Sequence, residues 1–181
     1  MNLLDRGHSY LTRWHSRPDM GQRENLAEHM GWVARLSMLI ANELPIAGLN
    51  WKKLYEMALL HDDAELIMGD VPGGFKNQYP EARETIKRWE GKLLPHMYGD
   101  TIDPDLYKDT LYEFYAQETL ESKIVKVADT VAALAYADMQ VKMGNQFFES
   151  IATSIEVDAV AQLQALPIPK NTIQRLVEEI L

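Results

Sequence analysis

The sequence predicts an all-α fold, organised as a single compact helical bundle over residues 1–181. Apolar residues recur at intervals of three and four along several long segments, which is the spacing of one helical face. No segment shows the strict alternation of apolar and polar residues that marks a half-buried strand. The length of 181 residues, with 46% hydrophobic and 25% charged residues, is typical of one soluble globular domain.

The composition limits the cellular setting and the partners that we expect. The chain has no cysteine, which excludes disulfides, thiolate metal ligands and a cysteine nucleophile. No apolar run reaches the roughly 18 residues of a membrane span, and the N-terminus lacks the pattern of a signal peptide. We therefore expect a cytoplasmic protein (in the host cytoplasm, if the source is a phage) with no membrane partner.

The net charge of −9 argues against a protein that binds nucleic-acid polymers through its general surface field. It does not argue against a small anionic substrate, because such a substrate needs only a few local cations. We expect any anion pocket to be built from particular Arg and Lys residues.

The clearest helix start is at Asn25, a predicted N-cap with Glu28 at the third helical position. One face of the helix that follows carries His29, Val33, Leu36, Ile40 and Leu44. Pro45 and Gly48 are expected to end it.

A second helix is expected over residues 51–68, with one face that carries Leu54, Ala58, His61 and Glu65. The stretch 69–74 contains Gly and Pro and is expected to end this helix, with Gly73 and Gly74 making a turn. Further helices are expected over residues 81–97, 106–116, 119–143, 147–166 and 171–181, with a loop over residues 98–104.

Four polar residues, namely His29, the adjacent pair His61 and Asp62, and Asp129, lie on three predicted helices. Each of these helices otherwise presents apolar residues on the same face, so we expect the four side chains to point inward. A buried, unpaired carboxylate is costly, and a divalent cation would satisfy all four groups together. The mixed nitrogen and oxygen set suits Mn, Fe, Co, Ni or Zn better than Ca, with Mg also possible.

Each of these residues also has a purely structural interpretation. A single inward His is more often a hydrogen-bonded core residue than a metal ligand. Asp129 has Lys126 one helical turn away and can pair with it. The metal interpretation therefore depends on the combination of residues, and on their order along the chain.

The pattern H…HD…D on an all-α chain resembles the phosphohydrolases of the HD superfamily. The flanking segments more closely resemble the 5′-deoxynucleotidase branch and the related phage deoxynucleoside triphosphate triphosphohydrolases. The likeness extends over about residues 10 to 150. The segments that carry it are Arg13-Trp14, residues 24–29, residues 60–72 with Lys76, and residues 122–129, extended by Gly144-Asn145 and Phe148.

The resemblance implies roles for ten residues. It implies a divalent metal held by His29, His61, Asp62 and Asp129. Glu65 is implied to sit by the metal-bound water, and Asp70 to act in proton transfer at the phosphate. Phosphate contacts are implied for Arg13, Lys76 and Lys126. Trp14 is implied to pack against the base or sugar.

The chemistry of these residue types agrees with the implied roles. The planar fork of Arg13 suits a phosphate, and Lys76 and Lys126 supply point charges. Glu65 comes four residues after His61, on the same face of the predicted helix. Core packing is the alternative for Trp14, and a solvated surface charge is the alternative for Arg13 and Lys76.

The segment over residues 15–21 departs from the deoxynucleotidase pattern, because it is polar where relatives tend to be apolar. It would line the nucleoside end of the pocket, so the base preference stays open. Arg17 and Arg23 could contact additional phosphates, which keeps triphosphate substrates open as well.

These observations predict an enzyme that releases phosphate from deoxynucleoside 5′-monophosphates. The first alternative is removal of triphosphate from a deoxynucleoside triphosphate, with dATP as one candidate. The second is a nucleotide-binding protein with a vestigial metal site. We also expect a homo-oligomer, with a Met- and Tyr-rich C-terminal half that could supply an apolar interface.

Overall fold

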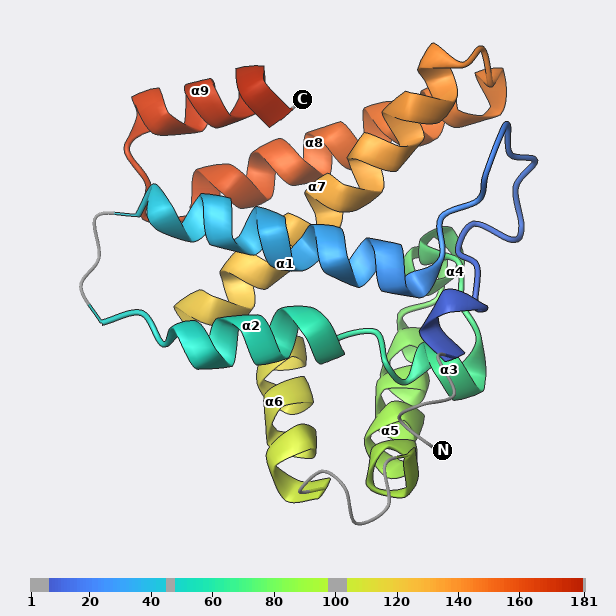
Figure 1. Cartoon of the computed structure of the whole chain (residues 1–181), viewed down its shortest axis with the longest axis vertical. Coiled ribbons are helices and arrows are strands. Elements are labelled where there is room, and N and C mark those ends of the chain that lie inside the picture. The colour runs from blue at the N-terminus through green and yellow to red at the C-terminus, as the bar shows by residue number, and fades with distance from the viewer. Residues whose placement is uncertain (1–6, 45–47, 98–103, 181) are drawn as a thin grey trace.

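The computed structural model describes residues 7–44, 48–97 and 104–180, and Figure 1 shows their arrangement. Within these ranges the regular elements are helices, and one isolated bridge joins Thr12 and Asn25. In chain order they are η2 (Gly7–Ser9), α1 (Leu26–Asn42), α2 (Trp51–Leu60), α3 (Glu65–Met68), α4 (Gly73–Gln78), α5 (Pro80–Met97), α6 (Pro104–Ala116), α7 (Leu120–Lys142), η4 (Gln146–Phe148), α8 (Glu149–Ala165) and α9 (Lys170–Ile180). The predicted all-α fold class is confirmed.

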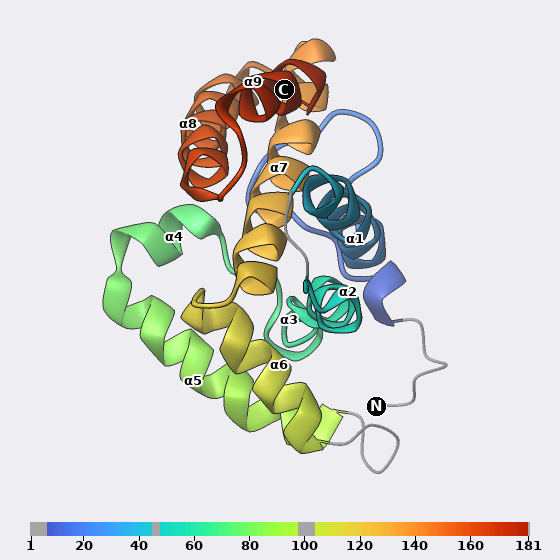
Figure 2. The same cartoon turned by 90° about the vertical axis from the view of Figure 1, so that its left-hand side faces the viewer.

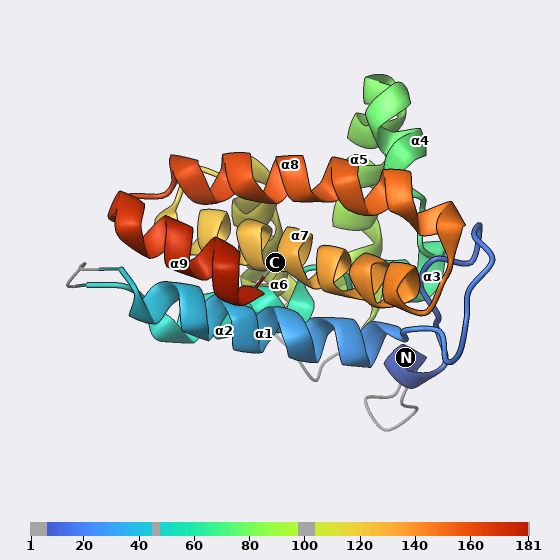
Figure 3. The ribbon, with the colours of Figure 1, turned by 90° about the horizontal axis from the view of Figure 1, so that it is seen from above.

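The long helix α7 forms the centre of the structure, with α1 packed on one side and α8 on the other (Figure 3). Helices α2 and α6 also pack against α7. Fully buried apolar side chains from these helices form one core, among them Val33, Ile40, Leu54, Val131 and Phe148. Helices α5 and α6 pack against each other and extend away from α8 and α9 (Figure 2).

Helix α1 begins as the sequence predicts. The Asn25 side chain accepts the backbone N–H of Glu28, and the Glu28 carboxylate accepts the backbone N–H of Asn25. The helix ends at Asn42, with Glu43 as its C-cap. Pro45, which we expected to end the helix, lies outside the described residues.

The expectation of one helix over residues 51–68 is wrong. Helix α2 ends at Leu60, and α3 begins at Glu65. Between them the backbone N–H of Asp63 bonds to Leu60 O at 3.1 Å, and that of Glu65 bonds to Asp62 O at 2.9 Å. These contacts span three residues rather than four, so they tighten the chain into turns.

The prediction for residues 69–74 is also partly wrong. Gly69 has a φ of 78°, which favours glycine, and the chain does turn there. Helix α4 then begins at Gly73, so Gly73 and Gly74 form its first turn, directly after Pro72.

The remaining elements agree with the predicted helices to within about two residues at each end, apart from the short η4 before α8. Thr119 caps α7 by accepting the backbone N–H of Ser122. Most of the expected loop over residues 98–104 lies outside the described residues. None of the described helices is both long and apolar enough to cross a bilayer.

Candidate metal centre and substrate site

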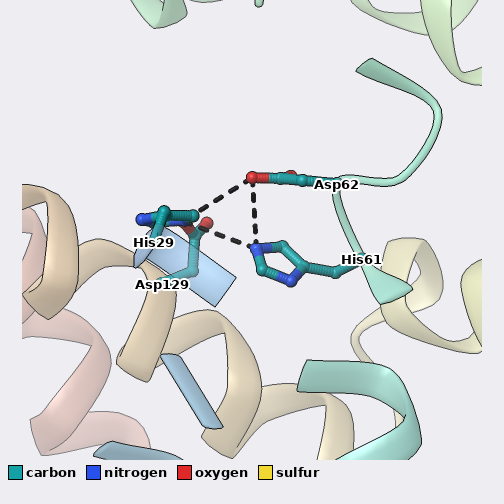
Figure 4. Close-up of side chains that lie close together, drawn as sticks. All are labelled: His29, His61, Asp62 and Asp129. Atoms are coloured by element: carbon teal, nitrogen blue, oxygen red, sulfur yellow. Dashed lines mark hydrogen bonds and ion pairs between the residues drawn. The ribbon is translucent and has the colours of Figure 1, made fainter. Parts of the chain in front are cut away.

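The four predicted metal ligands come together in the structure (Figure 4). One ligand atom from each of His29, His61, Asp62 and Asp129 lies within 4.8 Å of the others. His29 Nε2 is 3.2 Å from Asp129 Oδ1 and 3.5 Å from Asp62 Oδ2. His61 Nε2 is 3.3 Å from Asp62 Oδ2. Helix α1, the end of α2, the turn after it and α7 each supply one side chain.

The break after α2 explains how the side chains of two adjacent residues, His61 and Asp62, can both point to the ligand cluster. Neighbouring residues on a regular helix diverge by about 100°. In this structure His61 is the C-cap of α2 and Asp62 lies in the turn after it. Asp62 Oδ2 lies 3.5 Å from His29 Nε2, and His61 Nε2 lies 3.9 Å from Asp129 Oδ1, so both side chains reach the pair formed by His29 and Asp129.

The surroundings of His61 fit a bound cation. Its Nδ1 donates to the carbonyl oxygen of Ala58 at 3.0 Å, so its Nε2 is directed to the cluster, where it has no hydrogen bond among the described residues. Burial alone would lower the pKa of His61, but Asp62 and Asp129 outweigh it and raise the pKa to about 10. The carboxylates therefore favour positive charge at this atom. Two imidazoles and two carboxylates are a suitable donor set for a divalent transition metal.

His29 has a different electrostatic environment. Its side chain is fully buried, and burial together with the guanidinium of Arg13 lowers its pKa to about 4. The ring is therefore neutral near pH 7 and offers a lone pair, as a metal ligand must. Its Nδ1 lies 3.8 Å from Glu24 Oε2.

Arg13 borders the cluster instead of standing free in a pocket. Its Nη1 donates to Asp62 Oδ2 at 2.6 Å, and its Nε lies 3.6 Å from Glu24 Oε2. Burial would lower the pKa of Arg13, but the nearby carboxylates, led by Asp62, raise it. The structural alternative for Arg13, a solvated surface charge, is therefore wrong, because its side chain is only 12% exposed.

Glu24 is a site residue that the sequence did not single out. Its side chain is buried between Arg13 and His29, and burial raises its pKa to about 7 although Arg13 opposes the shift. It lies in a segment that carries the family resemblance. However, no helical spacing predicts its burial, because Glu24 and its partner Arg13 both lie outside the helices.

Lys126 donates to Asp129 Oδ2 at 2.7 Å, so the predicted pairing along one helical turn is present. Its side chain as a whole is 43% exposed, so Lys126 lies at the border of the cluster and not in the core. Lys76 lies half-buried on α4, and among the described residues no carboxylate oxygen is within 4 Å of its ammonium nitrogen.

Glu65 is the first residue of α3, and its side chain is buried. Its Oε2 has no hydrogen bond to any described residue. Burial and the charge of Asp62 raise the pKa of Glu65 well above its usual range, while Arg13 and Lys76 oppose the shift. A buried carboxyl group with a raised pKa is a candidate for proton transfer in a site of this kind.

Trp14 and Asp70 are joined through the backbone. The Asp70 carboxylate accepts the Trp14 N–H at 3.0 Å and holds a residue whose φ is 61°. The Trp14 ring stacks on Tyr136 with centroids 5.5 Å apart, and it contacts Phe148 at 5.4 Å. Packing against the core, the structural alternative for Trp14, is therefore present.

The segment from Trp14 to Arg23 forms a loop that α7 and its end hold in place. The buried Gln140 accepts the Met20 N–H at 2.8 Å and donates to Met20 O at 3.0 Å. Asn145 donates to Pro18 O at 2.9 Å. Arg23 donates to Asp19 and to the carbonyl oxygen of Arg17, so its guanidinium serves the loop.

Comparisons with known sequences identify the family. Residues 5–179 match the model of a family described as 5′-deoxynucleotidase YfbR-like. A 5′-deoxynucleotidase of Pasteurella multocida (strain Pm70) is 29% identical over 154 residues, which cover 81% of this chain and 76% of that protein. A 5′-deoxynucleotidase of Vibrio atlanticus (strain LGP32) is 27% identical over 143 residues, which cover 74% and 71%.

Solved structures share the fold. An HD-domain phosphohydrolase of Listeria innocua has a TM-score of 0.71 at 22% identity, over 96% of this chain and 81% of that chain. The HD phosphohydrolase of cyanophage S-2L, bound to dA and one catalytic Zn²⁺ ion, has a TM-score of 0.72 at 20% identity, over 96% and 90%. The family match over nearly the whole chain confirms the predicted nucleotide phosphohydrolase: this chain belongs to the YfbR-like 5′-deoxynucleotidase family.

Proposed function

We propose that this chain hydrolyses deoxynucleoside 5′-monophosphates to a deoxynucleoside and phosphate at a metal centre formed by His29, His61, Asp62 and Asp129. The observation that carries the proposal is the approach of four ligand atoms, from separate elements, to within 4.8 Å of one another. The bound metal supplies the Lewis-acid chemistry that makes hydroxide accessible at neutral pH.

The proposed roles of the surrounding residues follow from their contacts. Glu65 takes the proton of the attacking water, because its carboxyl is buried beside the cluster and one of its oxygens has no hydrogen bond to a described residue. Asp70, to which the family resemblance assigns proton transfer at the phosphate, gives a proton to the 5′ oxygen as the bond from phosphorus to that oxygen breaks. Trp14, whose backbone N–H is held by Asp70, is proposed to pack against the base or sugar.

Three cations are proposed to bind the phosphate. Arg13 and Lys126 each pair with one metal-ligating carboxylate. A bound metal would take over the neutralisation of these carboxylates, and the two cations would then be free to turn to the substrate. Lys76 supplies a third positive charge from α4. The arrangement gives an acidic protein the local positive charge that a nucleotide requires.

The second candidate, hydrolysis of deoxynucleoside triphosphates with release of triphosphate, has one supporting observation. Arg17 is exposed on the loop, and no ion pair of its side chain to a described residue is present. Arg23, the other cation considered for extra phosphates, is already engaged with Asp19. The structure therefore offers one additional loop cation for a longer phosphate chain.

A substrate panel tests both candidates. The protein is stripped of metal with a chelator and reloaded with Mn, Fe, Co, Ni, Zn or Mg. It is then incubated with deoxynucleoside and ribonucleoside monophosphates and triphosphates. Free phosphate from a deoxynucleoside monophosphate supports the main proposal, and intact triphosphate from a deoxynucleoside triphosphate supports the second. No turnover with any metal would favour a nucleotide-binding protein without catalysis.

A variant carrying both His61→Ala and Asp62→Ala assigns the activity to this centre. We expect it to lose metal binding and turnover together. Asp158→Ala, which removes an exposed carboxylate on α8, serves as the control and should retain both. Full activity in the double variant would overturn the proposed site.

Three further expectations stay predictions. We propose that residues 1–181 form one domain, that the chain works in the cytoplasm, and that it self-associates. Light scattering of the purified protein at several concentrations measures its mass in solution. A mass near 20.7 kDa at every concentration would contradict self-association.

A further inference from the structure

A third carboxylate, that of Asp63, stands directly beside the ligand pair in the turn between α2 and α3. Its side chain is 1% exposed, and its contacts differ from those of Asp62. Asp63 Oδ2 accepts the hydroxyl of Tyr107 at 2.6 Å, and Oδ1 lies 2.8 Å from His8 Nε2. A carboxylate this deeply buried is costly unless such partners are present.

The two partners come from distant parts of the chain. Tyr107 lies on α6 and is itself buried, and its hydroxyl is also 3.5 Å from the carbonyl oxygen of Leu60 at the end of α2. His8 lies in η2, near the start of the described chain. Asp63 therefore joins α6 and the N-terminal segment to the turn that carries Asp62.

The contact with Tyr107 bears on the metal ligands. The turn is held by backbone bonds from Asp63 N to Leu60 O and from Leu66 N to Asp63 O, at 3.1 and 3.0 Å. These bonds lie within the turn, whereas the bond from Asp63 to Tyr107 connects the turn to a different helix, α6. Asp62 is the residue directly before Asp63, so this connection acts next to a ligand of the cluster.

The contact with His8 bears on residues 7–13, which we call the Arg13 arm. After η2, Leu11 O accepts the N–H of Leu26, and Arg13 N donates to Glu24 O, both at 2.9 Å. Arg13 then reaches Asp62 at 2.6 Å. The arm is thus attached to the same turn twice, through His8 to Asp63 and through Arg13 to Asp62.

We propose that Asp63 is a positioning residue that fixes the metal-ligand turn through Tyr107 and the Arg13 arm through His8. The inference rests on the metal centre of the proposed function. It adds that the geometry of this centre and the placement of the phosphate-binding Arg13 are set by one buried carboxylate with two separable partners.

The role proposed for Tyr107 is tested with Tyr107→Phe. Titration calorimetry with Zn²⁺ should show metal binding weakened about tenfold, within the 10- to 100-fold typical when an outer partner of a metal site is removed. The visible absorption of the Co²⁺-loaded protein should change, because it reports the coordination geometry. The control is Tyr112→Phe, which removes the hydroxyl of an exposed tyrosine on the same helix and should leave both readouts unchanged.

The role proposed for His8 is tested with His8→Ala. Its Zn²⁺ affinity should match the wild type. The KM for a hydrolysed nucleotide should rise about tenfold, as expected for the loss of one charge-assisted hydrogen bond, while kcat falls less. Tyr10→Ala, at a side chain that is 80% exposed on the same arm, is the control and should leave KM unchanged.

Asp63→Asn should combine both defects. If Asp63→Asn does not fold, Tyr107→Phe still decides the question, because it leaves the carboxylate in place. Wild-type Zn²⁺ affinity and an unaltered Co²⁺ spectrum in Tyr107→Phe, with only a lower Tm, would overturn the proposal. An unchanged KM in His8→Ala would remove its second half. Failure of the wild-type protein to bind metal would instead contradict the proposed function.

Discussion

The ligand cluster and the loop over residues 14–23 border the same site, but different forces hold them. His29 and Asp129 project from long helices whose neighbouring apolar side chains are fully buried in the core. The loop has no regular secondary structure, and it is held by polar contacts from Gln140 and Asn145. The helix-borne ligands His29 and Asp129 therefore rest on packing, whereas the loop, apart from the Trp14 ring that stacks on Tyr136, rests on a few hydrogen bonds.

This difference has an energetic consequence. Full burial of a large apolar side chain contributes about 1.5–3 kcal/mol, and many such side chains surround the cluster. A single hydrogen bond contributes a net of about 0.5–1.5 kcal/mol. We therefore expect the positions of His29 and Asp129 to tolerate the loss of one peripheral contact, and the loop to respond to it. A substitution in the loop can then change substrate binding without changing metal binding.

The largest effect is expected from Asp129→Ala, which removes one ligand of the cluster. Metal binding and turnover should fall by more than the 10- to 100-fold that is typical for the loss of an outer partner. Calorimetric titration with Zn²⁺ and steady-state kinetics measure the two losses. Near-normal metal affinity in this variant would show that the cluster is not the metal centre, and that the comparison has misplaced the chemistry.

Phe148→Ala tests the place where the two regions meet. Phe148 is fully buried in the core, and it contacts both Trp14 of the loop and Tyr136 of α7. Its truncation should lower the free energy of unfolding by about 3–5 kcal/mol, as measured by urea denaturation. The adjacent Phe147 is 67% exposed, so Phe147→Ala should change the stability little. Equal effects of the two variants would contradict the assignment of Phe148 to the core.

Gln140→Ala tests the loop alone. Gln140 is fully buried, and its loss leaves the backbone N–H and carbonyl of Met20 without this partner. We expect a loss of about 1–3 kcal/mol in stability and a higher KM, because the loop that carries Trp14 is released. Metal affinity should stay at the wild-type level.

The control for this variant is Gln164→Ala, at an exposed position on α8. It should change neither stability nor KM. A drop in Zn²⁺ affinity in Gln140→Ala would contradict the separation of the two regions.

The same division explains how much the sequence could predict. The helices around the cluster follow from the spacing of apolar residues and from local caps such as Asn25, and both signals lie within a few residues. The approach of His29 and Asp129 was predictable because each lies on the apolar face of a long helix. Asp62 reaches the cluster from a turn that the helical spacing did not predict. The family resemblance also implied that Trp14 and Arg13 lie near the site.

Long-range contacts account for what the sequence did not predict. Helix α2 ends at Leu60 in turns with three-residue hydrogen bonds, and the Tyr107 hydroxyl of α6 bonds to Asp63 within these turns. The spacing of apolar residues along the sequence does not report either feature. The pairing of Arg13 with Asp62 joins residues 49 positions apart, and the bond of Gln140 to Met20 joins residues 120 apart. No periodicity reports such pairs.

The smallest effect is expected from Glu113→Gln, at an ion pair outside both regions. Glu113 of α6 accepts from Lys53 of α2 at 2.6 Å and from the Thr119 hydroxyl at 2.7 Å. Burial would raise the pKa of Glu113, but these partners outweigh it and lower the pKa below its usual range. Because the pKa is lower in the folded state, the pair stabilises the fold above the unfolded pKa of about 4.3. The stabilisation is lost as the pH falls through the folded value.

Glu113→Gln should therefore cost about 0.5 kcal/mol at pH 7, a small amount because solvent screens a pair in which Lys53 is 39% exposed. Urea denaturation of both proteins at several pH values should show the difference shrinking as the solution is made acidic. Zn²⁺ affinity and KM should not change, since neither the ligands nor the loop touch this pair. A change in Zn²⁺ affinity would mean that His29 and Asp129, the ligands on long packed helices, depend on a polar contact far from the cluster, and the contrast between these packed ligands and a hydrogen-bonded loop would then have to be given up.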